Sequence, residues 1–464
     1  MVGCILWVSA SGQTWRMAFG AYGADVGKQI AWVDDGTIIV GGTTGSFGSG
    51  ASDIYLMWLD GDGFLTRSAT IGGAGVDEFV DMEHLPNGDL LVVANSNSGG
   101  DYDGMLVRTD PLGNVIWQQT YGSDDWDFFR DLLVLDTGEM IVVGQSFRPG
   151  VDGEVWVIRM NDTGAMSEEW LLGGDGVQDG RSICRVPDGF AMAGSTGAGD
   201  GSDALLIRVG EDGSVLWTHT FGGDSLDMVN DVVATSDGGF SMVGTTHSYS
   251  PWEEAYHVKV DGDGNEVWFR NWGQINDQGA MKHLELPNGE FVSIGYTKTS
   301  GGGAKDMFLL RSAANGDFIF GRTYGGEQDD VGYGLDVTND GFVCTGWTSS
   351  YGAGGRDVFV VRTDGSGVTQ SEQVGTHFDP LEVEEHGTVP LVFMPNPSCG
   401  VFWLSGQKAG VDWVVHDGSG RTVVTGRTAA NEPIVVRSEP GVYFIEIVDG
   451  AAMRRQGRLV IIDR

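Results

Sequence analysis

Runs of β-branched and aromatic residues alternate with turns rich in Gly and Asp through most of this chain. In the best-preserved stretch, the runs 231–235 and 240–245 flank one turn, and the runs 256–260 and 266–271 flank another. Each pair of runs has the sequence signal of a β-hairpin. The stretch therefore predicts four short antiparallel strands in a unit of about 50 residues.

The unit recurs seven times, and four positions mark each copy. The first mark is a glycine after an aromatic or aliphatic residue, at Gly20, Gly72, Gly122, Gly173, Gly222, Gly273 and Gly325. About five residues later comes an acid, at Asp25, Asp77, Asp127, Asp179, Asp227, Asp277 and Asp330. A small residue closes a later strand, at Gly42, Ala94, Gly144, Gly194, Gly244, Gly295 and Gly346. The fourth mark is an acid that opens the next strand, at Asp53, Asp103, Asp152, Asp203, Glu254, Asp306 and Asp357.

Seven four-stranded units predict an all-β, seven-bladed β-propeller. One unit cannot bury both of its faces, so neighbouring units must stack and the ring must close. Trp15 precedes Gly20 by five residues, as Trp117 precedes Gly122, so we expect the N-terminal strand to complete the last blade. Residues 5–8 then form a leftover strand, and a degenerate eighth blade is the alternative to seven.

The composition narrows the classes of partner. The chain of 464 residues has 27 Lys and Arg against 65 Asp and Glu, a formal net charge of -38 that disfavours nucleic acid and anionic membranes. No apolar run has the length of a membrane span. The four cysteines lack metal-ligand spacing, so we interpret them as structural thiols.

A second domain follows the repeats. Residues 1–365 form the predicted propeller, residues 366–389 an acidic linker, and residues 390–464 a domain with eight Lys and Arg against seven Asp and Glu. Its predicted strands span residues 391–394, 401–404, 413–416, 423–425, 434–437, 442–448 and 457–462. Seven short strands with Gly and Asp turns predict a small immunoglobulin-like β-sandwich.

Four segments of the second domain carry a family resemblance. They span 393–404, 414–421, 440–445 and 458–462, and they include Pro395, Asn396, Pro397, Gly400, Asp417, Gly420, Gly441 and Tyr443. In this order at the C-terminus they resemble the type A sorting domain of type IX secretion substrates. The resemblance implies that the secretion machinery of a Bacteroidetes-like bacterium recognises this domain and exports the protein to the cell surface or the medium.

The resemblance extends to the repeats, which are similar to propeller repeats found in front of such sorting domains. This similarity implies architecture and not chemistry. Members of the family enter the periplasm through an N-terminal signal peptide. The first 15 residues contain no Lys or Arg, so we do not predict a signal peptide and expect a truncated gene start.

The repeated acids and tryptophans can be interpreted as either structural or functional residues. The sequences 60–63 and 261–265 resemble half of a calcium loop but lack its distal Glu, so we favour turn chemistry over calcium. The acids Asp25, Asp77, Asp127, Asp179, Asp227, Asp277 and Asp330 form either a functional carboxylate ring or repeated turn caps. We favour caps, because catalysis needs one asymmetric constellation. By the same reasoning, Trp15, Trp117, Trp217 and Trp268 pack between blades.

Residues that break the repeat are the candidates for catalysis. They are Glu83, His84, Arg130, Asp131, Lys282, His283 and Glu285, all predicted on first strands near the channel. No pair has a diagnostic spacing and no nucleophile or metal motif occurs, so we interpret them as a polar channel rim and expect no catalytic residue.

Three functions fit this sequence. The first is an exported, non-enzymatic propeller that binds an extracellular glycan or protein, with the C-terminal domain as its secretion signal and no cofactor. The second is a secreted hydrolase or lyase acting on polysaccharide, which two non-repeated channel acids about 5–9.5 Å apart would favour. The third is a structural surface adhesin.

Overall fold

The computed structural model describes residues 14–148, 153–173, 176–197, 201–273, 276–299, 301 and 304–369. Beyond these it describes residues 374–378, 393–394, 401–404, 412–417, 421–427, 434–435, 441–449 and 453–461. The chain divides into two compact units, Met1–Asp379 and Pro380–Arg464. Within the described ranges, no helix has the length and apolarity needed to cross a membrane.

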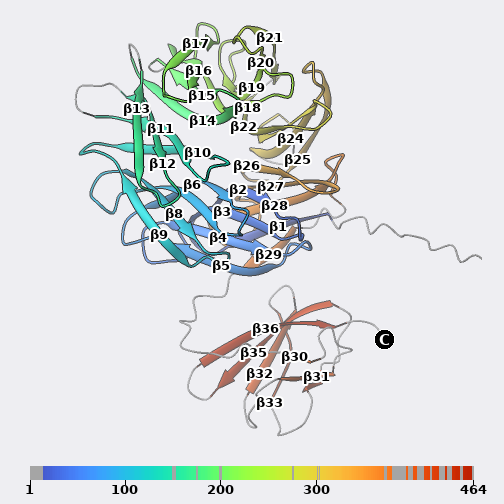
Figure 1. Ribbon diagram of the computed structural model, residues 1–464. Helices are drawn as coiled ribbons and strands as arrows, with labels where there is room; N and C mark the ends of the chain where they lie inside the picture. The colour runs from blue at the N-terminus through green and yellow to red at the C-terminus, as the bar shows by residue number, and fades with distance from the viewer. Residues whose placement is uncertain are drawn as a thin grey trace, which may run out of the picture. The chain divides into compact units, whose positions relative to one another are not determined.

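The first unit is a seven-bladed β-propeller, as predicted, and its blades follow one another around a centre (Figure 1). Blades 1 to 3 consist of β2 (Asp25–Trp32), β3 (Ile38–Thr44), β4 (Asp53–Leu59) and β5 (Leu65–Ile71); β6 (Asp77–His84), β7 (Leu90–Ser96), β8 (Asp103–Thr109) and β9 (Val115–Tyr121); and β10 (Asp127–Val134), β11 (Met140–Ser146), β12 (Glu154–Met160) and β13 (Met166–Leu172).

Blades 4 to 6 have the same antiparallel meander. They consist of β14 (Gln178–Val186), β15 (Gly189–Thr196), β16 (Asp203–Gly210) and β17 (Val215–Phe221); β18 (Asp227–Ala234), β19 (Phe240–Thr246), β20 (Glu254–Val260) and β21 (Glu266–Trp272); and β22 (Gln278–Glu285), β23 (Phe291–Thr297), β24 (Asp306–Ser312) and β25 (Phe318–Tyr324).

The two ends of the repeat region close the ring in blade 7. This blade comprises β26 (Asp330–Val337), β27 (Gly341–Thr348), β28 (Asp357–Asp364) and the N-terminal strand β1 (Trp15–Gly20). β1 pairs antiparallel with β28, so the predicted closure is confirmed. A fifth strand, β29 (Val374–Phe378), adds in parallel to β1, which places it within the segment expected to be a linker. The predicted leftover strand at residues 5–8 lies outside the described residues.

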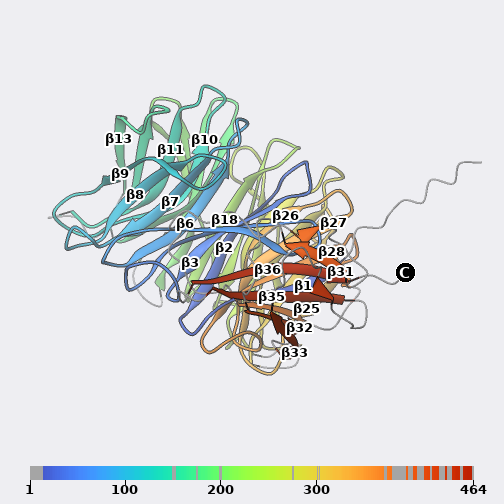
Figure 2. The same cartoon turned by 90° about the horizontal axis from the view of Figure 1, so that it is seen from below.

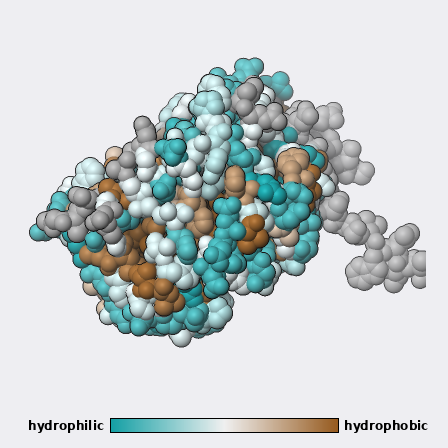
Figure 3. All heavy atoms as spheres, turned by 90° about the horizontal axis from the view of Figure 1, so that it is seen from above, coloured by the Kyte–Doolittle hydropathy of each residue, from teal (hydrophilic) through white to brown (hydrophobic). Residues whose placement is uncertain are grey.

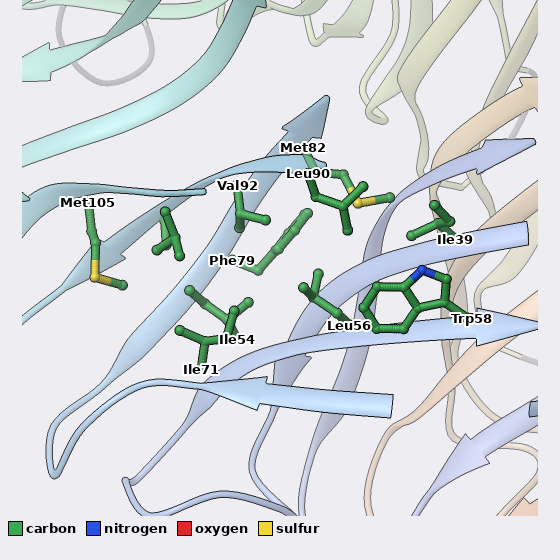
Figure 4. Packing of buried hydrophobic residues seen from close by; sticks show 12 residues of the cluster. Ile39, Ile54, Leu56, Trp58, Ile71, Phe79, Met82, Leu90, Val92 and Met105 are labelled. Atoms are coloured by element: carbon green, nitrogen blue, oxygen red, sulfur yellow. The ribbon is translucent and has the colours of Figure 1, made fainter. Parts of the chain in front are cut away.

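The hydrophobic core lies between successive blades. Figure 4 shows one such cluster, in which Leu56 and Trp58 of β4 meet Phe79, Met82 and Leu90 of blade 2. Phe79 is 2% exposed, and burying a side chain of this size stabilises the fold by about 1.5–3 kcal/mol. Neighbouring sheets therefore bury their apolar faces against one another, as the repeat predicts. Figure 2 shows the stacked sheets from a second direction.

A β-bulge in each first strand determines what faces the channel. In β10 the pairing with β11 shifts between Phe129 and Asp131, and the other six first strands shift at the equivalent place. A Cβ atom at Gly144, opposite this bulge, would lie 1.8 Å from the carbonyl oxygen of Phe128. The repeated small residue therefore makes room for the bulge, and the bulge lets two successive side chains line the channel in six blades and Tyr333 alone in blade 7.

The second unit consists of short antiparallel strands. One sheet has the order β30 (Phe393–Met394), β31 (Val401–Leu404) and β34 (Ile434–Val435). The other has the order β33 (Thr422–Arg427), β32 (Asp412–Asp417), β35 (Gly441–Asp449) and β36 (Met453–Ile461). Packing of these sheets as an immunoglobulin-like sandwich remains a prediction.

Candidate functional site in the central channel

The repeated acids cap turns on one face of the propeller. Asp227, the first residue of β18, accepts hydrogen bonds from the Gly223 N–H at 2.8 Å, from the Ser248 hydroxyl at 2.6 Å and from the Thr246 hydroxyl. Asp25, Asp77, Asp127 and Asp330 likewise accept a backbone N–H from four residues earlier. Their bonds join the turn between two blades to the end of the second strand.

Two of the predicted acids do not occupy this position. Gln178 pairs with Thr196 and Gln278 with Thr297, as Asp227 pairs with Thr246, so glutamine takes the capping place in blades 4 and 6. Asp179 instead contacts Arg130 at 3.4 Å and Arg181 at 2.8 Å, and Asp277 contacts Lys298 at 2.6 Å. The alignment of acids was therefore wrong by one residue in these two blades.

The third strand of the preceding blade differs in the same two places. β12 opens with Glu154 and β20 with Glu254, where the other blades have Asp. Asp152, the acid predicted to open β12, lies outside the described residues. A Glu thus faces a neutral Gln at these two junctions, whereas two aspartates converge on the glycine at four others. At one of these four, burial and then the charge of Asp25 raise the pKa of Asp357 to about 7. At the remaining junction, burial and then the charge of Asp227 raise the pKa of Asp203.

The remaining repeated residues have structural partners. Asp60 Oδ1 accepts the N–H groups of Asp62 at 3.0 Å and Phe64 at 2.9 Å, and Asp261 does the same in blade 5. The uncharged Asn161 makes the same two bonds in blade 3, so these bonds need no charge. Trp15, Trp117, Trp217 and Trp268 each approach a turn glycine of the next blade, at Gly63, Gly164, Gly264 and Gly316.

The described cysteines are Cys184 and Cys344, and both are free thiols. Burial raises the pKa of Cys184 to about 12, which keeps the thiol protonated and unreactive at neutral pH. Cys4 and Cys399 lie outside the described residues. Among the side chains that the structure describes, no three His, Cys, Asp or Glu residues converge as a metal-ligand set.

A cavity of about 250 Å³ occupies the channel, and all seven first strands line it. Its outer ring, here called the bulge ring, consists of the bulge residues Lys28, Val80, Arg130, Arg181, Asn230, Met281 and Tyr333. The Lys28 ammonium lies 3.8 Å from the centre of the Tyr333 ring, and the Arg181 guanidinium donates to Asn230 Oδ1 at 3.0 Å. The bulge ring is therefore mainly cationic and polar.

The residues one position further along the strands form a second ring, here called the acidic ring, in which Asp81, Asp131 and Asp231 stand beside Gln29, Ser182 and Lys282. Gln29 donates to Asp81 at 2.6 Å, and the Ile183 N–H donates to Asp131 at 2.8 Å. Asp81 and Asp131 hydrogen-bond to each other, and burial together with the Asp81 charge raises the pKa of Asp131 well above its ordinary value. Burial alone would lower the pKa of Lys282, but the surrounding carboxylates raise it.

Glu83 lies two residues beyond Asp81 on β6. Water reaches its side chain, yet protein surrounds the carboxyl group. This loss of solvation, followed by the charges of Asp81 and Asp336, raises the pKa of Glu83 to about 7 despite the opposing charge of Lys282. Glu83 therefore exchanges its proton near neutral pH.

A buried polar chain leads from the acidic ring into the core between blades 5 and 6. Asp231 Oδ2 lies 2.7 Å from His283 Nδ1, and His283 Nε2 lies 3.0 Å from the Ser241 hydroxyl. That hydroxyl also lies 2.7 Å from His257 Nε2. Both histidines and Ser241 are fully buried, so this chain has the geometry of a charge relay without an accessible nucleophile.

Burial alone would raise the pKa of Asp231, but its bond to His283 and the charges of His283 and Lys282 hold it below the ordinary value. Burial and then the His283 charge lower the pKa of His257 well below its ordinary value, so this ring is neutral. The equivalents of His283 in the other blades are all apolar: Ile30, Met82, Leu132, Ile183, Val232 and Leu335.

The structure brings together some of the residues that break the repeat. Asp131 and Lys282 line the channel cavity, and Arg130 lies at its mouth. Glu83 is not among the lining residues, but its carboxyl group interacts electrostatically with Asp81, Lys282 and Asp336. His283 points into the core instead, and Glu285 accepts hydrogen bonds from the N–H and hydroxyl of Ser236 in a neighbouring turn. His84, the last residue of β6, is not among the residues lining the cavity.

The sequence reasoning missed several members of the site. They are Asp81, Asp231, Ser241 and His257, which lie next to or across from residues that it singled out. Alignment of the seven strands by their bulges would have exposed Asp81 and Asp231, because they share one position with Asp131. The same alignment would have exposed Ser241 and His257, because these polar residues lie on adjacent core strands of blade 5 where blade 2 has Leu91 and Leu106.

No protein-family model matches the chain, and no curated protein matches it. Among solved structures, the Pan2 WD40 domain of Neurospora crassa is 11% identical over 75% of this chain and 92% of its own, with a TM-score of 0.47. A PL25 ulvan lyase is 9% identical over 75% and 96%, at 0.47. The phage phi92 endosialidase is 10% identical over 97% and 88%, at 0.44. Identities this low do not indicate a shared activity. The assignment of the propeller fold rests on the strand order of the structure itself.

Proposed function

We propose that the chain is an exported, non-enzymatic propeller that binds an extracellular glycan or protein at the mouth of its central channel. Its C-terminal unit, folded as an immunoglobulin-like sandwich, directs secretion through the type IX machinery. The observation that supports binding most strongly is the composition of the bulge ring. Capping and turn positions repeat nearly unchanged, whereas the bulge ring holds six residue types in seven places.

An asymmetric ring is what ligand recognition requires. Three of its members, Lys28, Arg130 and Arg181, are cationic in a chain whose formal net charge is -38. The same mouth offers aromatic surface, because Tyr333 lies under Lys28, and Phe128 lies 5.3 Å from the Arg130 guanidinium carbon. Cations beside aromatic faces suit a ligand with anionic or polarised groups on an apolar ring.

The deeper acids fit a binding role better than hydrolysis. Asp81 and Asp131 hydrogen-bond directly, so their carboxyl groups lie closer than the about 5–9.5 Å that separates the two carboxyls of glycosidases. Gln29 and a backbone N–H hold them in place, and His283 is committed to Asp231 and Ser241. The carboxyl groups of Asp81, Asp131 and Asp231 are thus engaged in bonds that stabilise the channel wall.

The secretion part of the proposal is supported by the motif segments of the second unit. Gly441 opens β35, Tyr443 lies within it, and Asp417 ends β32. Pro395, Asn396, Pro397, Gly400 and Gly420 lie outside the described residues. The order of these motifs at the C-terminus is the feature that resembles sorting domains.

Binding to immobilised polysaccharides tests the proposal. The panel contains neutral, uronate-bearing and sulfated polymers together with host surface proteins, and the full chain is compared with Lys28→Ala/Tyr333→Ala. We expect at least one probe to bind and to lose affinity at least tenfold in this variant. Arg67→Ala, a change on the exposed strand β5, is the control and should bind as the wild type does. An equal affinity of all three proteins for every bound probe would contradict the proposed site.

A secreted enzyme acting on polysaccharide is the second candidate, and Glu83 favours it. This residue is an acid that recurs only as Asp336 of blade 7, and it is open to water with a pKa of about 7, as a general acid requires. Release of reducing ends from the same polymers measures this activity. Activity that falls at least 100-fold in Glu83→Gln would establish the enzyme, and its absence from the wild type would reject it.

A further inference from the structure

Four aromatic side chains gather at the junction between blades 2 and 3. Tyr102 precedes β8, Trp126 precedes β10, Phe128 is the second residue of β10, and Phe147 follows β11. The Phe128 ring centre lies 5.3 Å from that of Tyr102, 6.2 Å from that of Trp126 and 6.5 Å from that of Phe147. The four rings therefore form one contiguous surface, here called the aromatic platform.

The platform breaks the repeat of the propeller. The Asp127 N–H donates to the Tyr102 carbonyl at 2.8 Å and the Phe147 N–H to the Trp126 carbonyl at 3.0 Å, and the other six junctions make the same two bonds. All residues at the equivalent four positions are described, and none of them is Phe, Tyr or Trp. In place of Trp126 the other blades have Ala24, Val76, Val177, Leu226, Asp277 and Asp329. A blade junction therefore forms without aromatic rings.

The platform is open to solvent. Trp126 is 57% exposed, and the other three rings are half-buried. Within the described residues no hydrogen bond uses the Trp126 indole N–H or the Tyr102 hydroxyl, so both groups can bond to a ligand. An exposed aromatic cluster that the fold does not require is typical of an interaction surface.

Three carboxylates flank the platform. Asp101 precedes Tyr102, Asp124 and Asp125 precede Trp126, and no ion pair among the described residues involves any of the three. Burial and then the charges of Asp101 and Asp127 raise the pKa of Asp103, so the local potential is negative. An anionic polymer would be repelled here, and an apolar protein surface would bury these carboxylates without partners. The hydroxyls of a neutral sugar can donate to them.

The arrangement of the rings favours a flat ligand over a cation. The Tyr102 and Trp126 planes meet at 79° and those of Trp126 and Phe128 at 82°, with centres 6.2 Å apart in both pairs. Rings at this distance are in direct contact, so no space for a cation is left between them. The Arg130 guanidinium already lies against Phe128 at the channel side. A ligand reaches only the outer faces, which suit the C–H face of a pyranose ring.

We propose that the aromatic platform binds a neutral polysaccharide. Pyranose rings stack on Trp126 and Tyr102, and their hydroxyls donate to the flanking carboxylates. Phe128 connects the platform to Arg130 of the bulge ring, so the sugar chain extends from the channel mouth over the blade 2–3 junction. The inference rests on the proposed function, because it names the class of extracellular glycan that the propeller binds.

Affinity electrophoresis of the full chain in native gels tests the proposal. The gels contain laminarin, galactomannan or arabinoxylan, with polygalacturonate as the anionic comparator. The variant Tyr102→Ser/Trp126→Val has the residues of the junction between blades 1 and 2, Ser52 and Val76, so we expect it to fold. At least one neutral polymer should retard the wild type, and its dissociation constant should rise at least tenfold in this variant. Trp252→Val removes another exposed tryptophan and is the matched control that should bind as the wild type does.

Lys28→Ala/Tyr333→Ala separates the platform from the channel mouth. Binding that requires Lys28 and Tyr333 but not the platform would refute this inference and leave the mouth site standing. Binding of a neutral polymer that requires the platform but not Lys28 and Tyr333 would support the platform and count against the mouth site.

Three results would overturn the proposal. The first is a wild type that no neutral polymer retards, and the second is equal retardation of the wild type and Tyr102→Ser/Trp126→Val. The third is a loss of affinity in this variant for polygalacturonate or a host surface protein but for no neutral polymer. If the double variant fails to fold, judged by far-ultraviolet circular dichroism, Trp126→Val alone decides.

Discussion

Replacement of Gly325 by alanine tests why the first repeated glycine is present in every blade. This glycine has no positive φ angle, so conformational freedom does not explain it. A Cβ atom there would lie 2.3 Å from Asp306 Oδ1 and 2.5 Å from Asp330 Oδ2. We infer that glycine is required because two carboxylates from adjacent blades converge above its Cα atom.

The structure allows the cost to be worked out. Asp330 cannot move aside without loosening its bonds to the Gly326 N–H at 2.8 Å and the Ser350 hydroxyl at 2.7 Å. Loosening the two bonds without breaking them costs about 1 kcal/mol in all, and overpacking a tight site costs about 1–3 kcal/mol. We therefore expect Gly325→Ala to destabilise the propeller by about 2–4 kcal/mol.

Thermal unfolding followed by tryptophan fluorescence measures this loss. For a protein of this size, 2–4 kcal/mol corresponds to a fall in Tm of about 3–6 °C. Gly365→Ala is the matched control, because its Cβ would meet nothing closer than 3.7 Å and should leave Tm unchanged. Equal Tm values for wild type and Gly325→Ala would refute the explanation from converging carboxylates.

Two further changes test the buried polar groups. The first is Asp357→Asn. Asp357 has a pKa of about 7 in the folded protein, above that of an unfolded Asp, so its contribution to stability is lost as pH rises from about 4 to 7. The Tm of Asp357→Asn relative to wild type should therefore rise over that range, and a pH-independent difference in Tm would count against the raised pKa. His283→Leu leaves Asp231 and Ser241 without their partner and should cost about 1–3 kcal/mol in urea unfolding. The triple variant His283→Leu/Ser241→Ala/His257→Leu, which introduces residue types found in other blades, should recover part of this loss. A single variant as stable as the wild type would show that the buried polar chain contributes nothing to stability.

The repeat made the propeller predictable from the sequence alone. Seven marks at intervals of about 50 residues predicted the blade number, and the position of Trp15 predicted closure by β1. β29 was not predicted, because its pairing with the exposed edge of β1 is a long-range contact within an acidic segment. Gln178 and Gln278 were missed because an acid lies next to each glutamine and the spacing tolerates one residue of drift.

The sites were less predictable than the fold. Glu83, Asp131 and Lys282 stood out because they break the repeat, but the bond between Asp81 and Asp131 depends on the rotation between two blades. A second cavity of about 640 Å³ lies between blades 5 and 6, where the buried core cluster has five residues, two of them alanines. No local sequence pattern predicts such a cavity. Figure 3 shows brown hydrophobic patches among hydrophilic residues on one face, and surface hydropathy alone does not point to either cavity.

The proposed export determines which ligands are relevant, and the intact mass of the natural product tests it most directly. The gene, with its upstream region, is expressed in a bacterium that has a type IX secretion system, and the mass is recorded from the medium and from washed cells. We predict an extracellular product that lacks about the last 75 residues of the sequence, residues 390–464. A full-length chain confined to the cytoplasm would contradict export and the extracellular ligands proposed with it.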